Sequence, residues 1–160
     1  MNRPLPRLVG VLLEALRFSE PDSGGLDRLS EPEWKELLAL CDRARLTLLL
    51  LRFEKESWPV WVRDRLHSNL KANIRRREHL RRVHEEIAAA LEAHGLPHLV
   101  LKGQAREDDY ADDPRLRVQY DLDLYCPAKA ASGALEALDL EKSEVFGLES
   151  IGSARITFRP

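Results

Sequence analysis

Two aspartates in the stretch RLRVQYDLDLYCP, residues 115–127, have a spacing that suits metal chemistry. One leucine separates Asp121 from Asp123, and because side chains alternate across a β-strand, both carboxylates would leave the same face. Neighbouring like charges repel each other, so such a pair is either solvated at a strand end or neutralised by a cation such as a divalent metal. In the second case, the pair could bridge two ions roughly 3.5–4 Å apart, as two-metal phosphoryl or nucleotidyl transfer requires.

A cation and a glycine precede this pair in the chain. The run LPHLVLKG, residues 96–103, reads as a short buried strand followed by a turn, and it ends in Lys102 and Gly103. A strand end of this kind would bring a backbone turn and a positive charge close to phosphates. Lys102 could equally be a surface lysine. Arg117 could form a salt bridge to the acids of EDDYADD, residues 107–113.

The elements that precede these residues are predicted to be helices. Apolar residues recur at helical spacing over residues 8–16, and Ser30 with Glu33 forms a capping box for a second helix, expected to continue to about Phe53. A third pattern runs from residue 59 to residue 94 and stops at Gly95; its length predicts a bend or a break. We therefore expect a helical subdomain over residues 1–95.

From Leu96 onward the pattern becomes that of a small sheet with helices. It predicts strands at 96–103 and 117–126, a helix at 128–138, and two short strands in EVFGLES and ARITFRP at the end. The fold class expected is α+β: an N-terminal helical subdomain followed by a small mixed-sheet unit over residues 96–160, which ends as if incomplete.

Composition narrows the setting in which the chain would work. The 25 basic and 27 acidic residues give a formal net charge of -2, so no global field attracts nucleic acid or membrane. Two cysteines far apart without a CxxC motif suit a reducing cytoplasm, and neither a secretory signal nor an apolar run long enough for a bilayer is evident. We expect a cytoplasmic protein without a membrane partner.

Several separated segments together resemble one family. LVLKGQA, YADDPRLR and YDLDLY are similar to the LLKG, YxDPxxR and DIDLLV signature of the uncharacterised nucleotidyltransferase family, in the polymerase-beta-like superfamily. The resemblance extends upstream through EWKELLALCDRARLTLLLL and EEIAAALEAHGLPHLVLKG, and covers about residues 31–140. It is most specific between residues 99 and 124.

The resemblance implies a reaction and a role for each candidate residue. A nucleoside triphosphate with Mg²⁺ or Mn²⁺ would pass its nucleoside monophosphate to an acceptor hydroxyl on a protein, a nucleic acid or a small molecule. Asp121 and Asp123 would be the first two catalytic metal carboxylates. Gly103 would lie at the turn that contacts the triphosphate, and Lys102 and Arg117 would neutralise phosphate charge.

The sequence departs from the superfamily at one important position. A third carboxylate is expected on a later strand, as metal ligand or base, but the last predicted strand, ARITFRP, contains none. Either the chain is truncated at its C-terminus, or it is a non-catalytic nucleotide-binding or regulatory pseudoenzyme. A third alternative is a helical interaction module in which the basic run between Arg75 and Arg82 binds an acidic partner, although a solvated helix face also explains this run.

Overall fold

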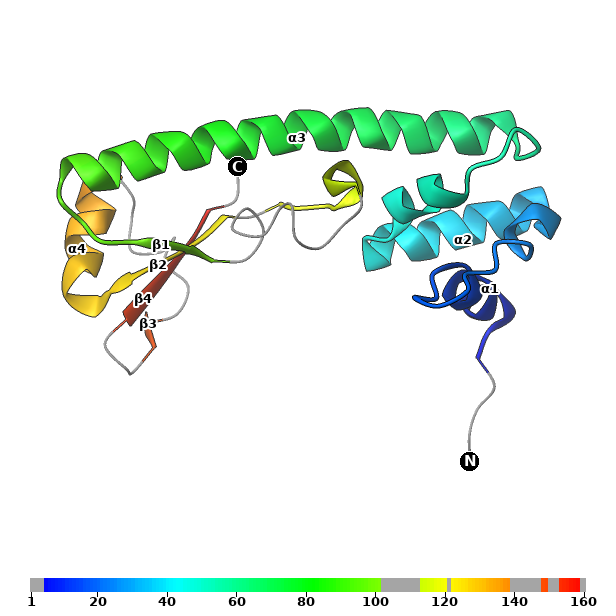
Figure 1. Cartoon of the computed structure of the whole chain (residues 1–160), viewed down its shortest axis with the longest axis horizontal. Helices are drawn as coiled ribbons and strands as arrows, with labels where there is room; N and C mark the ends of the chain where they lie inside the picture. Colours follow the sequence, from blue (N-terminus) through cyan, green and yellow to red (C-terminus); the bar gives the residue numbers. More distant parts are fainter. Residues whose placement is uncertain (1–4, 102–112, 121, 139–147, 150–152, 159–160) are drawn as a thin grey trace. The chain divides into compact units, whose positions relative to one another are not determined.

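The computed structural model describes residues 5–101, 113–120, 122–138, 148–149 and 153–158, and Figure 1 shows their helices and strands. The α+β class with a helical N-terminal part is confirmed. The chain divides into two compact units, which we call unit 1 (Met1–Asn73 with Arg115–Val118) and unit 2 (Ile74–Pro114 with Gln119–Pro160). The domain boundary expected after residue 95 stays a prediction.

Unit 1 is a helical bundle with its own core. It contains α1 (Arg7–Ala15), α2 (Glu31–Ala44), the short 3-10 helices η1 (Leu26–Arg28) and η2 (Thr47–Phe53), and the first part of α3 (Val60–Ala93). Leucines from these elements are buried together with two tryptophans, Trp34 and Trp58, whose ring centroids lie 4.7 Å apart. Aromatic side chains bury large areas, so this pair is central to the stability of unit 1.

Helix α2 begins where its capping signal predicts and ends earlier than expected. The Glu33 carboxylate accepts hydrogen bonds from the backbone N–H and the hydroxyl of Ser30, at 2.8 and 2.7 Å. The extension to Phe53 is wrong, because Arg45 adopts a left-handed conformation with φ 59° and stops the helix. The Leu46 N–H then donates to the Cys41 carbonyl at 2.8 Å, which completes a Schellman-type end.

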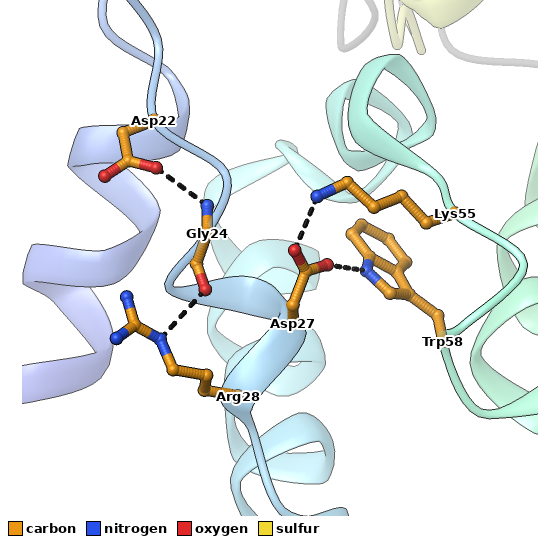
Figure 2. Close-up of polar contacts among 6 residues, drawn as sticks. All are labelled: Asp22, Gly24, Asp27, Arg28, Lys55 and Trp58. Carbon is orange, nitrogen blue, oxygen red and sulfur yellow. Dashed lines mark hydrogen bonds and ion pairs between the residues drawn. The ribbon is translucent and has the colours of Figure 1, made fainter.

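An exposed aspartate, Asp27, connects η1 to the loop before α3 (Figure 2). Asp27 accepts a hydrogen bond from the Trp58 indole N–H at 2.8 Å and forms an ion pair with Lys55. The Lys55 ammonium, followed by the Trp58 N–H, lowers the pKa of Asp27 below its ordinary value of 3.8. Asp27 therefore has a structural explanation, and we assign it to the stability of unit 1.

Helix α3 is continuous over its 34 residues, so the expected break is absent. Its sequence contains neither proline nor glycine, the residues that most often interrupt a long helix. The predicted stop at Gly95 is confirmed: Gly95 has φ 63°, its N–H donates to the Glu92 carbonyl at 2.9 Å, and the Leu96 N–H donates to the Leu91 carbonyl at 2.9 Å.

Unit 2 contains a four-stranded sheet in the order β1-β2-β4-β3. The strands are β1 (Leu99–Leu101), β2 (Leu122–Pro127), β3 (Leu148–Glu149) and β4 (Ser153–Phe158), and α4 (Ala128–Ala137) follows β2 directly. Every described pair in this sheet is antiparallel, where a mixed sheet was expected. The reason is that β4 lies between β2 and β3: β3 runs in the same direction as β2 but is not its neighbour.

The core of unit 2 lies between β2 and two helices. Leu122 and Leu124 are buried with Ile87 and Leu91 of α3, and the cluster also includes Cys126 and Ala134. Alternation along the strand places Asp123 on the opposite side of β2 from these leucines. No helix in the described ranges combines the length and the apolar composition needed to cross a membrane.

Candidate functional site

Asp123 lies inside β2, and its side chain is only 4% exposed. Its backbone is aligned with Leu101 of β1 on one side and with Thr157 of β4 on the other. Burying an ionised carboxylate is costly unless hydrogen-bond donors or cations accompany it. A buried aspartate in the middle of a sheet is therefore an unusual placement, and it makes Asp123 the strongest functional candidate among the described residues.

Three predicted site residues, Lys102, Gly103 and Asp121, lie outside the described residues. The sheet register describes the strands that adjoin them in the sequence, β1 and β2. Strand β1 ends at Leu101, the residue aligned with Asp123, and Lys102 and Gly103 follow Leu101 directly in the sequence. Their contacts with phosphate, and the pairing of Asp121 with Asp123 around a metal, stay predictions.

Arg117 belongs to unit 1, in the segment that follows the 3-10 helix η4 (Pro114–Leu116). Asn73 of α3, only 1% exposed, holds this segment by its main chain. Its side-chain amide donates to the carbonyl of Arg115 at 2.8 Å and to the carbonyl of Arg117 at 2.9 Å. The structure thus describes two of the five predicted site residues, Arg117 in unit 1 and Asp123 in unit 2, each within its own unit.

Asn73 was not identified from the sequence. Its partners are main-chain atoms more than forty residues away in the sequence, so no local sequence pattern predicts the contact. It also corrects the predicted strand at 117–126, which begins only at Leu122. The carbonyls of residues 115 and 117 accept hydrogen bonds from a helix side chain, and this pairing replaces the strand ladder that the alternating pattern predicted.

A second unpredicted contact involves Tyr120, the residue that precedes the acid pair in the sequence. The Arg76 guanidinium of α3 lies over the ring of Tyr120, 4.4 Å from the ring centroid, and Tyr120 immediately precedes Asp121. Arg76 and Tyr120 both belong to unit 2. The sequence contains one indication of this contact: Arg76 continues the helical spacing of Leu80, Val83 and Ile87, so it lies on the same side of α3 as these residues.

The strands beside β2 bear on the missing third carboxylate. Strand β4 has the sequence SARITF and contains no acid, and Thr157 is its residue aligned with Asp123. The described part of β3 contributes Glu149, which pairs with Ser153. Since Ser153 pairs in turn with Pro127, Glu149 belongs to the other end of β2. Over the strand residues that the structure describes, no third carboxylate is aligned with Asp123.

Other groups capable of metal or nucleophilic chemistry do not form a site in the described part of the chain. No group of three or more His, Cys, Asp or Glu residues is arranged there to hold a metal ion. Both cysteines are free and buried. Burial, with a smaller effect of the Asp42 charge, raises the pKa of Cys41 to about 12, and burial also raises the pKa of Cys126. Thiols with raised pKa values are poor nucleophiles at neutral pH.

The fold and the position of Asp123 define an α+β protein with a buried carboxylate at its sheet. The family model described as "Uncharacterised nucleotidyltransferase" matches residues 30–143, more than half of the chain. The chain therefore belongs to this uncharacterised nucleotidyltransferase family. No curated protein matches the chain, and no solved structure does.

Proposed function

We propose that this protein transfers a nucleoside monophosphate from a nucleoside triphosphate to an acceptor hydroxyl. Family membership supports the reaction class. The single observation that carries the proposal is Asp123, a carboxylate 4% exposed within β2 and aligned with the end of β1. The acceptor class is open between protein, nucleic acid and small molecule.

Asp121 and Asp123 are proposed to hold Mg²⁺ or Mn²⁺. Carboxylate oxygens are the donors that these hard cations prefer, so Asp123, the described member of the pair, fits such an ion. When bound, the ions stabilise charge on the attacking and the departing oxygens. The two carboxylates would fix the ions to one strand, whose position is set by the buried leucines Leu122 and Leu124.

Lys102, Gly103 and Arg117 are proposed to bind the triphosphate. The first two follow in the sequence directly after Leu101, the last residue of β1, which is aligned with Asp123. Arg117 lies on a segment whose main chain is held by Asn73. A glycine allows the backbone to approach phosphate oxygens closely, and the two cations offset their charge.

A binding experiment on the full chain tests this function without knowledge of the acceptor. Fluorescent ATP and GTP analogues are titrated with and without Mn²⁺ against the wild type, Asp123→Asn and Asp64→Asn. Asp64 is an exposed aspartate on α3 and serves as the matched control. We expect metal-dependent nucleotide binding that Asp123→Asn abolishes and Asp64→Asn retains. Binding that is independent of metal, or equal in both variants, would contradict the proposal.

The alternative is a non-catalytic nucleotide-binding protein of the same fold. It is favoured by Thr157, which is aligned with Asp123 where a third carboxylate would be useful. Incubation with α-³²P-labelled nucleoside triphosphates and a cell extract separates the two functions. Label transferred to any acceptor, with release of pyrophosphate, supports the enzyme. Nucleotide binding without transfer supports the alternative, and Thr157→Asp then tests whether the absent carboxylate is the cause.

We also propose a cytoplasmic location, because both cysteines are free thiols buried in the described structure. Nucleoside triphosphates and Mg²⁺ are available in that compartment. Fractionation of cells with an antibody to the chain tests the location. Recovery in an extracytoplasmic fraction would contradict it.

A further inference from the structure

One side of α3 faces β2 with a regular series of residues. Positions 76, 80, 83, 87 and 91 recur at intervals of three and four and therefore lie along one stripe of the helix. Ile87 and Leu91 are buried against Leu122 and Leu124, and Val83 packs against the same cluster. Arg76 is thus the polar end of a stripe that is otherwise apolar.

Tyr120 is the counterpart of Arg76 on the strand side. It stands two residues before Leu122, and alternation along extended chain directs it to the side of β2 that faces α3. The distance of 4.4 Å from the Arg76 guanidinium to the Tyr120 ring centroid is within the range of a cation–π interaction. The Tyr120 side chain is 42% exposed, so this contact lies at the solvent edge of the interface.

We propose that Arg76 is a positioning residue for Asp123, an inference that rests on the proposed function. Tyr120 stands two residues before Leu122, so its contact with Arg76 holds the chain just ahead of β2, the strand that contains Asp123. From Leu122 onward, the strand is held by pairing with its neighbouring strands and by the hydrophobic core. Ahead of Leu122, the contact between Tyr120 and Arg76 attaches the chain to α3. Metal binding needs its carboxylates held to within about half an ångström, so a looser entry weakens it.

The sign of the effect distinguishes positioning from simple electrostatics. Arg76 is a cation in the same unit as Asp123, so removing its charge alone would strengthen the binding of a divalent cation. Loss of positioning would weaken that binding. A weaker affinity for Mn²⁺ after removal of a positive charge is therefore the opposite of the electrostatic effect, and at unchanged thermal stability it supports the positioning role.

The test measures Mn²⁺ binding by the full chain, with the signal of free Mn²⁺ in electron paramagnetic resonance. The variants are Arg76→Gln, Tyr120→Leu, the pair combined, and Tyr120→Phe, which keeps the ring. Arg82→Gln removes the same charge from an exposed position of α3 and is the matched control. Asp123→Asn establishes that the metal measured is the one at the acid pair. Thermal unfolding is recorded for each chain.

We expect Arg76→Gln and Tyr120→Leu each to weaken Mn²⁺ binding about two- to fivefold, the range that one cation–π contact represents. The combined variant should be no weaker than either single one, because both remove the same interaction. Tyr120→Phe should retain the wild-type affinity, and Arg82→Gln should not weaken it. These results, with Asp123→Asn losing the site, support the proposal.

Two different failures remain distinguishable. If Asp123→Asn binds Mn²⁺ as the wild type does, the proposed metal site is wrong and this inference is overturned with it. If Asp123→Asn loses binding while Arg76→Gln and Tyr120→Leu match the wild type or bind more tightly, only the positioning role is overturned. Should Arg76→Gln not fold, the comparison of Tyr120→Phe with Tyr120→Leu decides: equal affinities overturn the role, and a loss confined to leucine supports it.

Discussion

Replacement of Asn73 by alanine should destabilise unit 1, because the side-chain amide of Asn73 donates hydrogen bonds to the main chain of residues 115 and 117. The side chain is 1% exposed and donates to two main-chain carbonyls, at 2.8 and 2.9 Å. A buried polar group that loses its partner costs ~1–3 kcal/mol. Arg115 is exposed and Arg117 is half-buried, so water can reach part of this segment and the lower end applies to each bond. Two bonds at about 1–1.5 kcal/mol each give about 2–3 kcal/mol.

The helix itself opposes this loss slightly. Alanine is a better helix former than asparagine by roughly 0.5 kcal/mol, so the net loss expected for Asn73→Ala is about 2 kcal/mol. Asn69→Ala makes the same change one turn earlier on α3, at a half-buried position, and shares the gain in helix propensity. Asn69→Ala is therefore the matched control, and its stability should equal or slightly exceed that of the wild type.

The assay is urea denaturation followed by tryptophan fluorescence. All three tryptophans, Trp34, Trp58 and Trp61, lie in unit 1, so their emission reports the unit to which Asn73 belongs. The midpoint should fall for Asn73→Ala at an unchanged slope, which indicates a loss of stability without a change in the surface exposed. A midpoint for Asn73→Ala within error of that for Asn69→Ala would refute the reasoning, because the two bonds would then contribute nothing.

Three further predictions concern unit 1. Because the pKa of Asp27 is lowered in the folded chain, the contribution of Asp27 to stability is present above about pH 4 and is lost as the pH falls through its folded-state pKa. The urea midpoints of the wild type and Asp27→Asn should therefore converge below pH 4. A difference between the two midpoints that stays constant with pH would count against this prediction. With its pKa raised to about 12, the Cys41 thiol should resist iodoacetamide at pH 8 in the folded chain and react after unfolding, which mass spectrometry follows; rapid labelling of the native protein would be inconsistent with its burial. Arg45→Gly should raise the free energy of unfolding by about 0.5–1 kcal/mol in urea titrations, because glycine adopts φ 59° without strain. A loss of stability would show that the interactions of the Arg45 side chain outweigh the strain of its backbone conformation.

Local signals in the sequence were sufficient where the structure depends on neighbours in the chain. Ser30 and Glu33 predicted the start of α2, and Gly95 predicted the end of α3, because caps involve residues three to five apart. The end of α2 was missed because a left-handed arginine, unlike a glycine, carries no such signal. The short strands near the end were predicted from alternation and are confirmed as β3 and β4.

The candidate site was less predictable, since its supports come from distant parts of the chain. The acid pair could be identified from its spacing, but the burial of Asp123 depends on strands and helices assembled around β2. The start of β2 was misplaced, and Asn73, a helix residue, donates to the carbonyl of Arg117, which the alternating pattern had assigned to a strand. Arg76 was interpreted as part of a charged run, whereas its position on the stripe that faces β2 gives it a defined partner.

The strand order has a consequence for how the protein is made. Strand β4 follows the other described strands in the sequence, yet it lies between β2 and β3. During translation, β1 can pair with β2 as soon as both leave the ribosome, but the other edge of β2, beside Asp123, waits for residues 153–158. An exposed strand edge can pair with other nascent chains, so this edge of β2 is open to such pairing until that segment emerges.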